Sequence, residues 1–259
     1  MLRILSFGNS FSDDSHRWLY DLACAAGVEI ETHDYVIGGC PLEWHAQNLR
    51  SGEGKYLYQK NGIYDPDSLE NPRRFRQGLE DGRWDIITIQ QVSHLAGKPE
   101  SNQPYLNELL AAIRKAQPQA KIYFHQTWEY EYCSEHPGFP DYGCDCDTMY
   151  AAVRANCRNI AREHALGLIP TGEAVHAAKR LSAFDSEHDG ISLYRDAFHM
   201  GWVYGRYLAA CVWLKTLCGV LPAADAFIPA QDGVTADPAL LAQLLRTAEE
   251  TVREHSILL

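Results

Sequence analysis

A serine near the start of the chain and an aspartate–histidine pair near its end have the residue types and spacing needed for nucleophilic chemistry. Ser10 follows the apolar run 4–7, and Asp196 stands three residues before His199. A serine hydroxyl becomes a good nucleophile only when a base removes its proton and a third group orients that base. An aspartate three residues before a histidine can fold back in one turn to hold one ring nitrogen, which leaves the other for the serine. The pattern therefore predicts a triad of Ser10, Asp196 and His199. Ser12 is a better candidate than Ser10 for the cap of the following helix, which leaves Ser10 free for chemistry.

Two other Asp-x-x-His pairs compete with this assignment, Asp13–His16 and Asp185–His188. The first lies on the helix expected directly after the serine, so its imidazole should point away from the hydroxyl. The second lies in a polar stretch that is typical of a surface turn. The third pair directly precedes an apolar helix expected over residues 201–218, which can hold both side chains rigidly. The third pair is therefore favoured.

Short apolar runs alternate with helical patterns, which predicts a parallel sheet covered by helices on both faces. The expected strands are 4–7, 28–36, 86–89, 122–124 and 166–169. The main expected helices are 104–116, 149–164, 201–218 and 238–255. Ser10 then stands at the carboxyl end of the first strand, where such sheets place their chemistry. Two segments outside the alternation, a hairpin at 56–64 and the irregular stretch 127–147, are candidates for the walls of the site.

Charge and composition bound the classes of partner. The chain has 259 residues and a formal net charge of −11, which argues against nucleic acid or an anionic membrane surface as a partner. The apolar stretch 207–221 is interrupted by Lys215 and is too short to cross a bilayer. No signal peptide precedes the first strand, so if Met1 is the native start we expect a cytoplasmic protein. Its eight cysteines are then expected to be reduced thiols.

Several blocks of the sequence, taken in order, resemble those of the SGNH/GDSL hydrolases. Residues 8–12, Gly-Asn-Ser-Phe-Ser, resemble the family's Gly-Asp-Ser-Leu block, and residues 196–199 resemble its last block. Residues 37–43 look like the second block, and residues 89–93, Ile-Gln-Gln-Val-Ser, fall where the family has Gly-x-Asn. The resemblance extends to about residue 219. It implies an α/β fold, a flavodoxin-like three-layer α/β/α sandwich with a five-stranded parallel sheet, and residues 1–259 are expected to form one such domain.

The oxyanion hole is where the sequence departs from the family. The family's asparagine, which donates a side-chain N–H to the oxyanion, is missing. Gln91 or Gln90 carries the same amide donor on a longer arm, and Ser93 is a third candidate. The resemblance also implies a backbone donor from Gly39, together with the N–H of the nucleophile itself. Asn9 replaces the aspartate before the nucleophile, which removes a charge.

The resemblance implies a serine esterase that cleaves small acyl groups, with O-acetyl esters on a carbohydrate as the expected substrate. Trp128, Glu43 and His125 are expected to contact the substrate, since aromatic rings beside amides and carboxylates suit sugars. This chemistry needs no metal and no organic cofactor, and the oligomeric state stays open. A thioesterase or lysophospholipase is an alternative that would need an apolar channel. A non-catalytic carbohydrate- or ligand-binding module is another, prompted by the missing asparagine.

Cysteines raise two competing sites. Cys40 follows two glycines, but no histidine pairs with it at a recognisable spacing, so a buried structural thiol is favoured over a nucleophile. Cys133, His136, Cys144 and Cys146 are four soft ligands within one loop and suit zinc by type. Their spacing is unlike that of the usual zinc knuckles. We therefore favour a loop whose cysteines pack against other residues or lie exposed.

Overall fold

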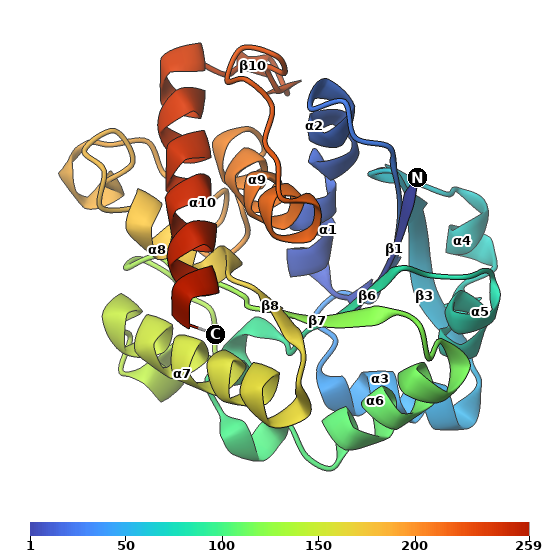
Figure 1. The fold of residues 1–259 in the computed structure, drawn as a ribbon. Helices are drawn as coiled ribbons and strands as arrows, with labels where there is room; N and C mark the ends of the chain where they lie inside the picture. Colours follow the sequence, from blue (N-terminus) through green and yellow to red (C-terminus); the bar gives the residue numbers. More distant parts are fainter. Residues whose placement is uncertain (259) are drawn as a thin grey trace.

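The computed structural model describes residues 1–258, with side chains described through His255. Its central sheet has the strand order β4-β3-β2-β1-β6-β7-β8, with β5 paired to β3 (Figure 1). Five of these strands are mutually parallel: β1 Leu2–Gly8, β2 Ile30–Val36, β6 Ile86–Ile89, β7 Lys121–His125 and β8 Gly167–Ile169. They correspond to the five strands predicted from the sequence. The predicted α/β fold class is confirmed.

An antiparallel extension widens the sheet beyond the five parallel strands. It consists of β3 (Gly54–Lys60), β4 (Ile63–Tyr64) and β5 (Arg73–Arg74). The turn between β3 and β4 is Asn61-Gly62, with φ of 52° and 74°, as a two-residue hairpin turn requires. The predicted hairpin is therefore present. It lies beyond β2, however, and none of its described contacts involves Ser10, Asp196 or His199.

Helices cover both faces of the sheet (Figure 1). One face carries α3 (Leu42–Ser51), α6 (Tyr105–Ala116) and α7 (Cys146–His164). The other carries α1 (Ser10–His16), α2 (Leu19–Ala25), α8 (Thr171–Ala178) and α9 (Tyr204–Cys218). The short helices α4 (Asp67–Glu70) and α5 (Phe75–Glu80) follow β4, and β9 (Ala230–Gln231) pairs with β10 (Val234–Thr235). None of the helices among residues 1–258 combines the length and the apolarity that crossing a bilayer requires.

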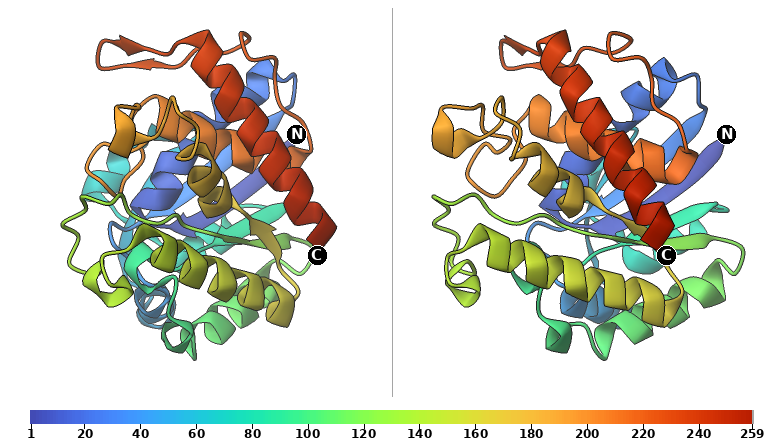
Figure 2. Two further views of the ribbon diagram at one scale, coloured as in Figure 1. Left: turned by 90° about the vertical axis from the view of Figure 1, so that its left-hand side faces the viewer. Right: turned by 60° about the vertical axis from the view of Figure 1, so that its left-hand side comes forward.

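The last helix forms a further layer outside the others. Helix α10 (Pro238–Leu258) lies along the outside of α9 and α8, as both views in Figure 2 show. Residues 205–214 of α9 are all buried, because α1, α2 and α8 cover one side of this helix and α10 the other. A helix that is apolar on all sides is a buried helix. Most of the apolar stretch 207–221 therefore belongs to this buried helix. Because α9 is held on both sides, it also fixes the position of the loop that precedes it.

Three of the buried histidines are almost completely shielded from solvent. His16, His45 and His125 are each at most 1% exposed, and burial lowers the pKa of each imidazole to about 3. The Nδ1 atom of His45 is 2.8 Å from the hydroxyl of Tyr56, which is also buried. These rings stay neutral in the folded protein, whereas an unfolded chain protonates them near the ordinary pKa of 6.5. Between pH about 6.5 and about 3 the unfolded state therefore binds more protons, and stability falls as the pH is lowered.

We expect His45→Phe to flatten this pH dependence. The substitution removes one imidazole that takes up a proton on unfolding. The slope of unfolding free energy against pH between roughly pH 6 and 4 should therefore fall by up to about 1.4 kcal/mol per pH unit. Urea denaturation at a series of pH values measures it. Tyr56→Phe is the matched control, because it removes the same hydrogen bond but no imidazole and should keep the slope. An unchanged slope in His45→Phe would contradict the expectation.

Candidate active site

Ser10 is held in the turn between β1 and α1. Asn9 caps the helix: its backbone is extended at φ −135° and its side-chain oxygen accepts from the Phe11 N–H at 3.1 Å. The helix begins at Ser10, earlier than expected, so the prediction that Ser12 is the cap is wrong. The Ser12 hydroxyl donates instead to the buried carboxylate of Asp34, at 2.9 Å. Gly8 permits this packing, since a Cβ there would lie 2.3 Å from the Ser12 oxygen.

Asp196 and His199 lie in a tight loop directly before α9. A bridge between Tyr194 and Met200 closes the loop. The Asp196 Oδ1 atom accepts from the backbone N–H of His199 at 2.7 Å, as expected for a carboxylate that folds back over one turn. Ala197 takes a positive φ of 66° at the tip. The backbone of the loop is thus shaped by the same aspartate that faces the imidazole.

Ser10, His199 and Asp196 form one hydrogen-bonded line, here called the Ser–His–Asp set. The Asp196 Oδ2 atom is 2.7 Å from His199 Nδ1, and His199 Nε2 is 2.8 Å from the Ser10 hydroxyl. A carboxylate only accepts, so Nδ1 carries the proton and Nε2 accepts from the serine. Burial raises the pKa of Asp196, but hydrogen bonds from His199 outweigh it and the net shift is downward. An ionised aspartate therefore fixes the tautomer that a general base needs.

The two competing Asp-x-x-His pairs are not joined to Ser10. His188 pairs with Asp185 at 2.9 Å, but its side chain is 80% exposed on a surface turn, as predicted. His16 points away from Ser10, also as predicted, and its Nε2 atom is 2.8 Å from the hydroxyl of Ser6 in β1. The favoured pair is therefore the one that the structure brings to Ser10.

Trp128 supports the loop from beneath and is buried. It is 0% exposed and stacks on Phe11 at 4.2 Å, and its indole N–H donates to the Phe198 carbonyl at 2.8 Å. The Glu131 N–H donates to the Ala197 carbonyl at 2.8 Å. The irregular segment expected beside the site thus lies along the 194–199 loop. The prediction that Trp128 binds substrate is wrong, because its ring is buried under this loop.

His125 also belongs to the interior. Its Nδ1 atom is 2.6 Å from Gln90 Oε1 and its Nε2 atom 3.1 Å from the Thr171 hydroxyl. The Gln90 amide donates to Asn9 Oδ1 at 2.7 Å, and the Asn9 amide donates to the Cys40 carbonyl at 3.1 Å. This line of polar side chains ties the end of β7 to the turn that carries Ser10. His125 is 1% exposed, so the prediction that it contacts substrate is wrong.

Gln91, the favoured side-chain donor for an oxyanion, has its amide engaged elsewhere. Its oxygen accepts from the Leu42 N–H at 3.0 Å and its amide N–H groups donate to Ser101, at 3.1 and 3.2 Å. The third candidate, Ser93, is hydrogen-bonded to Tyr130 at 2.8 Å. Gln91 thus anchors the start of α3, and its contacts do not support the predicted oxyanion role.

Backbone N–H groups remain available beside Ser10. Gly39 is exposed, with φ of 64°, and within the part of the chain that the structure describes no acceptor takes its N–H or that of Ser10. The turn that carries Gly39 is attached to the nucleophile turn: the Ile37 N–H donates to the Gly8 carbonyl at 3.1 Å. The adjoining Cys40 thiol is 0% exposed, and burial raises its pKa to about 12, which makes it a structural thiol.

Glu43 lies on the first turn of α3, partly exposed. It accepts from Gln47 at 3.3 Å and is hydrogen-bonded to Tyr105, where it raises the pKa of the phenol. No contact among the described residues joins it to the Ser–His–Asp set. The predicted contact with substrate stays a prediction.

His136, by residue type a possible zinc ligand together with three cysteines, lies beside the Ser–His–Asp set. Its ring is 5.0 Å from that of Phe198, which lies 4.1 Å from the His199 ring. Its Nδ1 atom accepts from the Gly138 N–H at 3.0 Å. Burial lowers the pKa of His136, as do the neighbouring His94 and His199. Among the described residues, no group of three or more His, Cys, Asp or Glu side chains is placed to hold a metal ion.

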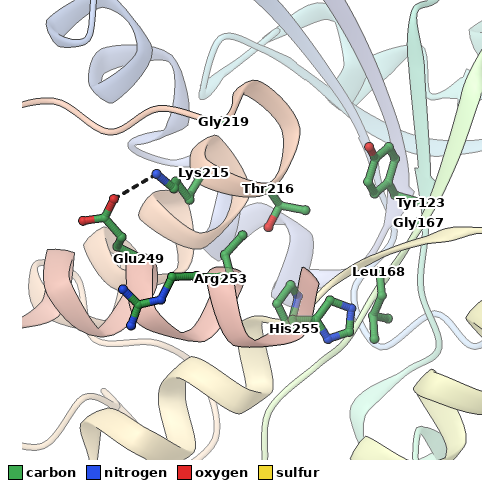
Figure 3. Close-up of a pocket in the computed structure, with 11 residues that line it drawn as sticks. Tyr123, Gly167, Leu168, Lys215, Thr216, Gly219, Glu249, Arg253 and His255 are labelled. Atoms are coloured by element: carbon green, nitrogen blue, oxygen red, sulfur yellow. Dashed lines mark hydrogen bonds and ion pairs between the residues drawn. The ribbon is translucent and has the colours of Figure 1, made fainter. Parts of the chain in front are cut away.

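A cavity of about 670 Å³ lies between β7, β8, α9 and α10 (Figure 3). Its lining residues come from β7 and β8, the end of α9 and the last turns of α10, and they include His255. Lys215 in this cavity is paired with Glu249 at 2.9 Å. None of Ser10, Asp196 and His199 lines this cavity, so it is separate from the Ser–His–Asp set.

The fold is that of the SGNH/GDSL hydrolases. The structure is similar to a putative SGNH hydrolase from Slackia heliotrinireducens, with a TM-score of 0.57 and 20% identity, covering 83% of this chain and 98% of that chain. It is also similar to a lipase/acylhydrolase from Enterococcus faecalis, with a TM-score of 0.52 and 13% identity, covering 85% and 97% of the two chains. At these identities the likeness concerns the fold.

The chain belongs to the DUF4886 family, described as a domain of unknown function, whose model matches residues 3–250. The crystal structure of a DUF4886 family protein from Bacteroides uniformis ATCC 8492 is similar throughout. It has a TM-score of 0.83 and 29% identity, covering 97% of this chain and 94% of that chain. No curated protein matches the sequence.

We expect Asn9→Asp to destabilise the protein, although it restores the aspartate of the SGNH/GDSL block. Asn9 is 1% exposed and donates to the Cys40 carbonyl. A carboxylate oxygen in that place would face another acceptor, which should cost about 1–3 kcal/mol of unfolding free energy. Urea denaturation at neutral pH measures the change. Asn107→Asp, the same substitution on an exposed helix side chain, should stay within about 0.5 kcal/mol of wild type. Equal stability of the two variants would refute this account of Asn9.

Proposed function

We propose that the protein is a serine esterase that hydrolyses small acyl esters, with Ser10 as nucleophile, His199 as general base and Asp196 as the group that orients the imidazole. One observation carries the proposal. The line from Asp196 through His199 to Ser10 has hydrogen-bond distances of 2.7 and 2.8 Å, in the tautomer that leaves Nε2 free to accept the serine proton. The SGNH/GDSL hydrolase fold supports the reaction class.

The reaction has two halves. Ser10 attacks the carbonyl carbon of the ester while His199 Nε2 takes the hydroxyl proton. The tetrahedral intermediate then collapses, the C–O bond to the alcohol breaks, and His199 returns the proton to the leaving alcohol. Water next attacks the acyl-enzyme with His199 again as base, which releases the acid and restores the serine. Asp196 stays ionised and stabilises the imidazolium in both halves.

The oxyanion would be stabilised by the backbone N–H groups of Ser10 and Gly39. Both groups are unused by other acceptors in the described part of the chain. Each such donor contributes about 3 kcal/mol to lowering the barrier. A third donor from Gln91 would need its amide to leave Ser101. We therefore base the proposal on the two backbone donors.

The proposed substrate is a small ester, with acetate as the acyl group and a carbohydrate as the alcohol. Asp196 has 40% of its side chain exposed, so the Ser–His–Asp set opens directly to solvent. An open site suits a bulky polar alcohol that stays hydrated, and it disfavours a long acyl chain that needs burial. The net charge of −11 fits a neutral substrate better than nucleic acid or an anionic membrane, and the proposal includes no cofactor.

A non-catalytic ligand-binding module on the same fold is the second candidate. The observation that favours it is the engagement of both glutamine amides, Gln90 with Asn9 and Gln91 with Ser101. An oxyanion hole that lacks a side-chain donor is weaker. A fluorophosphonate probe separates the two candidates, because it labels an activated serine covalently. Mass gain on Ser10 supports the esterase, and ligand binding without labelling supports the module.

We expect p-nitrophenyl acetate to be hydrolysed faster than the octanoate, and Ser10→Ala and His199→Gln each to lower kcat/KM by at least about 10⁴-fold. Without the nucleophile or its base, no acyl-enzyme forms. Initial rates by absorbance of the released nitrophenolate measure both effects. His188→Gln is the matched control, since His188 sits in the same Asp-x-x-His pattern, paired at 2.9 Å but remote from Ser10.

Hydrolysis that survives in Ser10→Ala would overturn the assignment of the nucleophile. Faster cleavage of the octanoate than of the acetate would favour a lipase-like or thioesterase-like site over the proposed small-acyl esterase. Acetate hydrolysis that depends on Ser10 would justify a screen of acetylated saccharides. Release of acetate from these, measured by a coupled assay, would test the carbohydrate part of the proposal.

A further inference from the structure

Asp14 is a buried carboxylate that the esterase reaction does not use. It lies four residues after Ser10 on α1, one turn along the helix, and is 0% exposed. Its Oδ1 atom accepts from Arg195 at 2.7 Å and from Arg206 at 2.8 Å. Its Oδ2 atom accepts from the backbone N–H of Met200 at 2.9 Å. Both oxygens of this buried group are therefore occupied.

Two of these three donors flank the loop that carries His199. Arg195 stands directly before Asp196, and Met200 directly follows His199. Arg195 also donates its side chain to the Met200 carbonyl and its backbone N–H to the His199 carbonyl, the latter at 3.0 Å. Asp14 thus binds both ends of the loop and is itself rooted in the helix that begins with Ser10.

The charges around Asp14 keep this link rigid. Burial raises the pKa of Asp14, and the guanidinium groups of Arg206 and Arg195 oppose that shift. Both guanidinium groups stack on Trp202, at 4.3 and 4.2 Å from its ring, which fixes their planes. Three N–H donors, two of them cationic, need an acceptor that carries no proton of its own. Removing one partner of such a buried set leaves the remaining charges uncompensated.

Rigidity matters because proton transfer depends on the distance between Ser10 and His199. A misplacement of about 1 Å in a reacting group can cost a factor of about 10² in rate. His199 reaches Ser10 from a loop 189 residues away in the sequence. The indole N–H of Trp128 and the backbone N–H of Glu131 donate to carbonyls on the outer side of this loop. On the inner side, the link to the nucleophile helix passes through Asp14.

We propose that Asp14 is a positioning residue that sets the distance between the Ser10 hydroxyl and the His199 imidazole by tying both ends of the His199 loop to helix α1. The inference rests on the proposed esterase function for its kinetic consequence. It rests on geometry alone for the placement of His199. The experiments below therefore measure the kinetic consequence and the placement of His199 separately.

The central variant is Asp14→Asn, with Asp13→Asn as the matched control. Asn keeps the shape of Asp14 but turns one acceptor into an NH₂ group, which would face the Met200 N–H or a guanidinium. Asp13 loses the same charge on the adjacent residue, but its described bonds go to Gln59, at 2.8 Å, and more distantly to Arg206, at 3.8 Å. With p-nitrophenyl acetate, Asp14→Asn should lower kcat by about 10- to 100-fold with KM within about twofold. Asp13→Asn should stay within about twofold of wild type.

Fluorophosphonate labelling separates misplacement from loss of folded protein. In Asp14→Asn we expect the final labelled fraction to match wild type and the rate constant of labelling to fall with kcat. A variant that was merely less folded would lose amplitude instead. If Asp14→Asn does not fold, Arg195→Met carries the test, because it keeps an unbranched side chain and removes the guanidinium that binds Asp14. The rate constant should then fall by about 5-fold or more, with the amplitude kept.

A second readout does not depend on catalysis. The His199 Nδ1 proton, shared with Asp196, should give a downfield proton resonance that His199→Gln identifies by its loss. Asp14→Asn should shift or broaden this resonance, and Asp13→Asn should leave it in place. If wild type is catalytically inert while Asp14→Asn still alters the resonance, the esterase proposal falls and the positioning role stands. A folded Asp14→Asn with wild-type resonance and wild-type labelling rate would overturn the positioning role.

Discussion

The hydrogen bond between His199 and Ser10 joins residues 189 positions apart, and the architecture around the site makes that one contact possible. Ser10 is fixed first, because β1 lies inside the sheet between β2 and β6 and delivers the serine at its carboxyl end. The loop before α9 is the second part of the site whose position is fixed by packing. Helix α9 packs on α1 and α2 and under α10, so its amino end has little freedom. The packing of α9 on α1 and α2 therefore brings the His199 imidazole within hydrogen-bond distance of the Ser10 hydroxyl.

Most of the fold and the Ser–His–Asp set followed from the sequence, for physical reasons. Buried parallel strands are short apolar runs, and a carboxylate folding back over one turn requires a fixed spacing, so both leave a local signature. No comparable local pattern indicates whether side chains such as Trp128 and His125 are buried or exposed. An aromatic or an imidazole at a strand end has the same sequence whether it faces solvent or the interior. Only the packing of a segment distant in sequence, the 194–199 loop over Trp128, decides between the two.

The side-chain amides of Gln90 and Gln91 show even more clearly that the sequence does not indicate a side chain's partners. Gln90 and Gln91 occupy the place of the asparagine expected by resemblance, and their chemistry is right for an oxyanion donor. Their longer arms reach other partners: Gln90 reaches Asn9, and Gln91 reaches Ser101. A buried amide left without partners costs stability, so the fold engages these groups before any substrate arrives. Residue type therefore predicted the capacity to donate, while the direction of donation depended on partners far away in the sequence.

The hydrogen bonds of Gln90 suggest a different role for the residue that replaces the missing asparagine. The Gln90 amide holds Asn9, and Asn9 holds the carbonyl of Cys40, which adjoins Gly39. The glutamine thus acts on the turn that presents a backbone N–H instead of presenting its own. In a serine hydrolase, a donor contributes to rate through its preorganisation, since its orientation must be set before charge develops on the substrate. A side chain that fixes the direction of a backbone donor can therefore serve the same step as one that donates directly. In the proposed esterase, the departure from the SGNH/GDSL pattern would therefore divide the oxyanion hole between the backbone donor of Gly39 and the buried side chains that orient it.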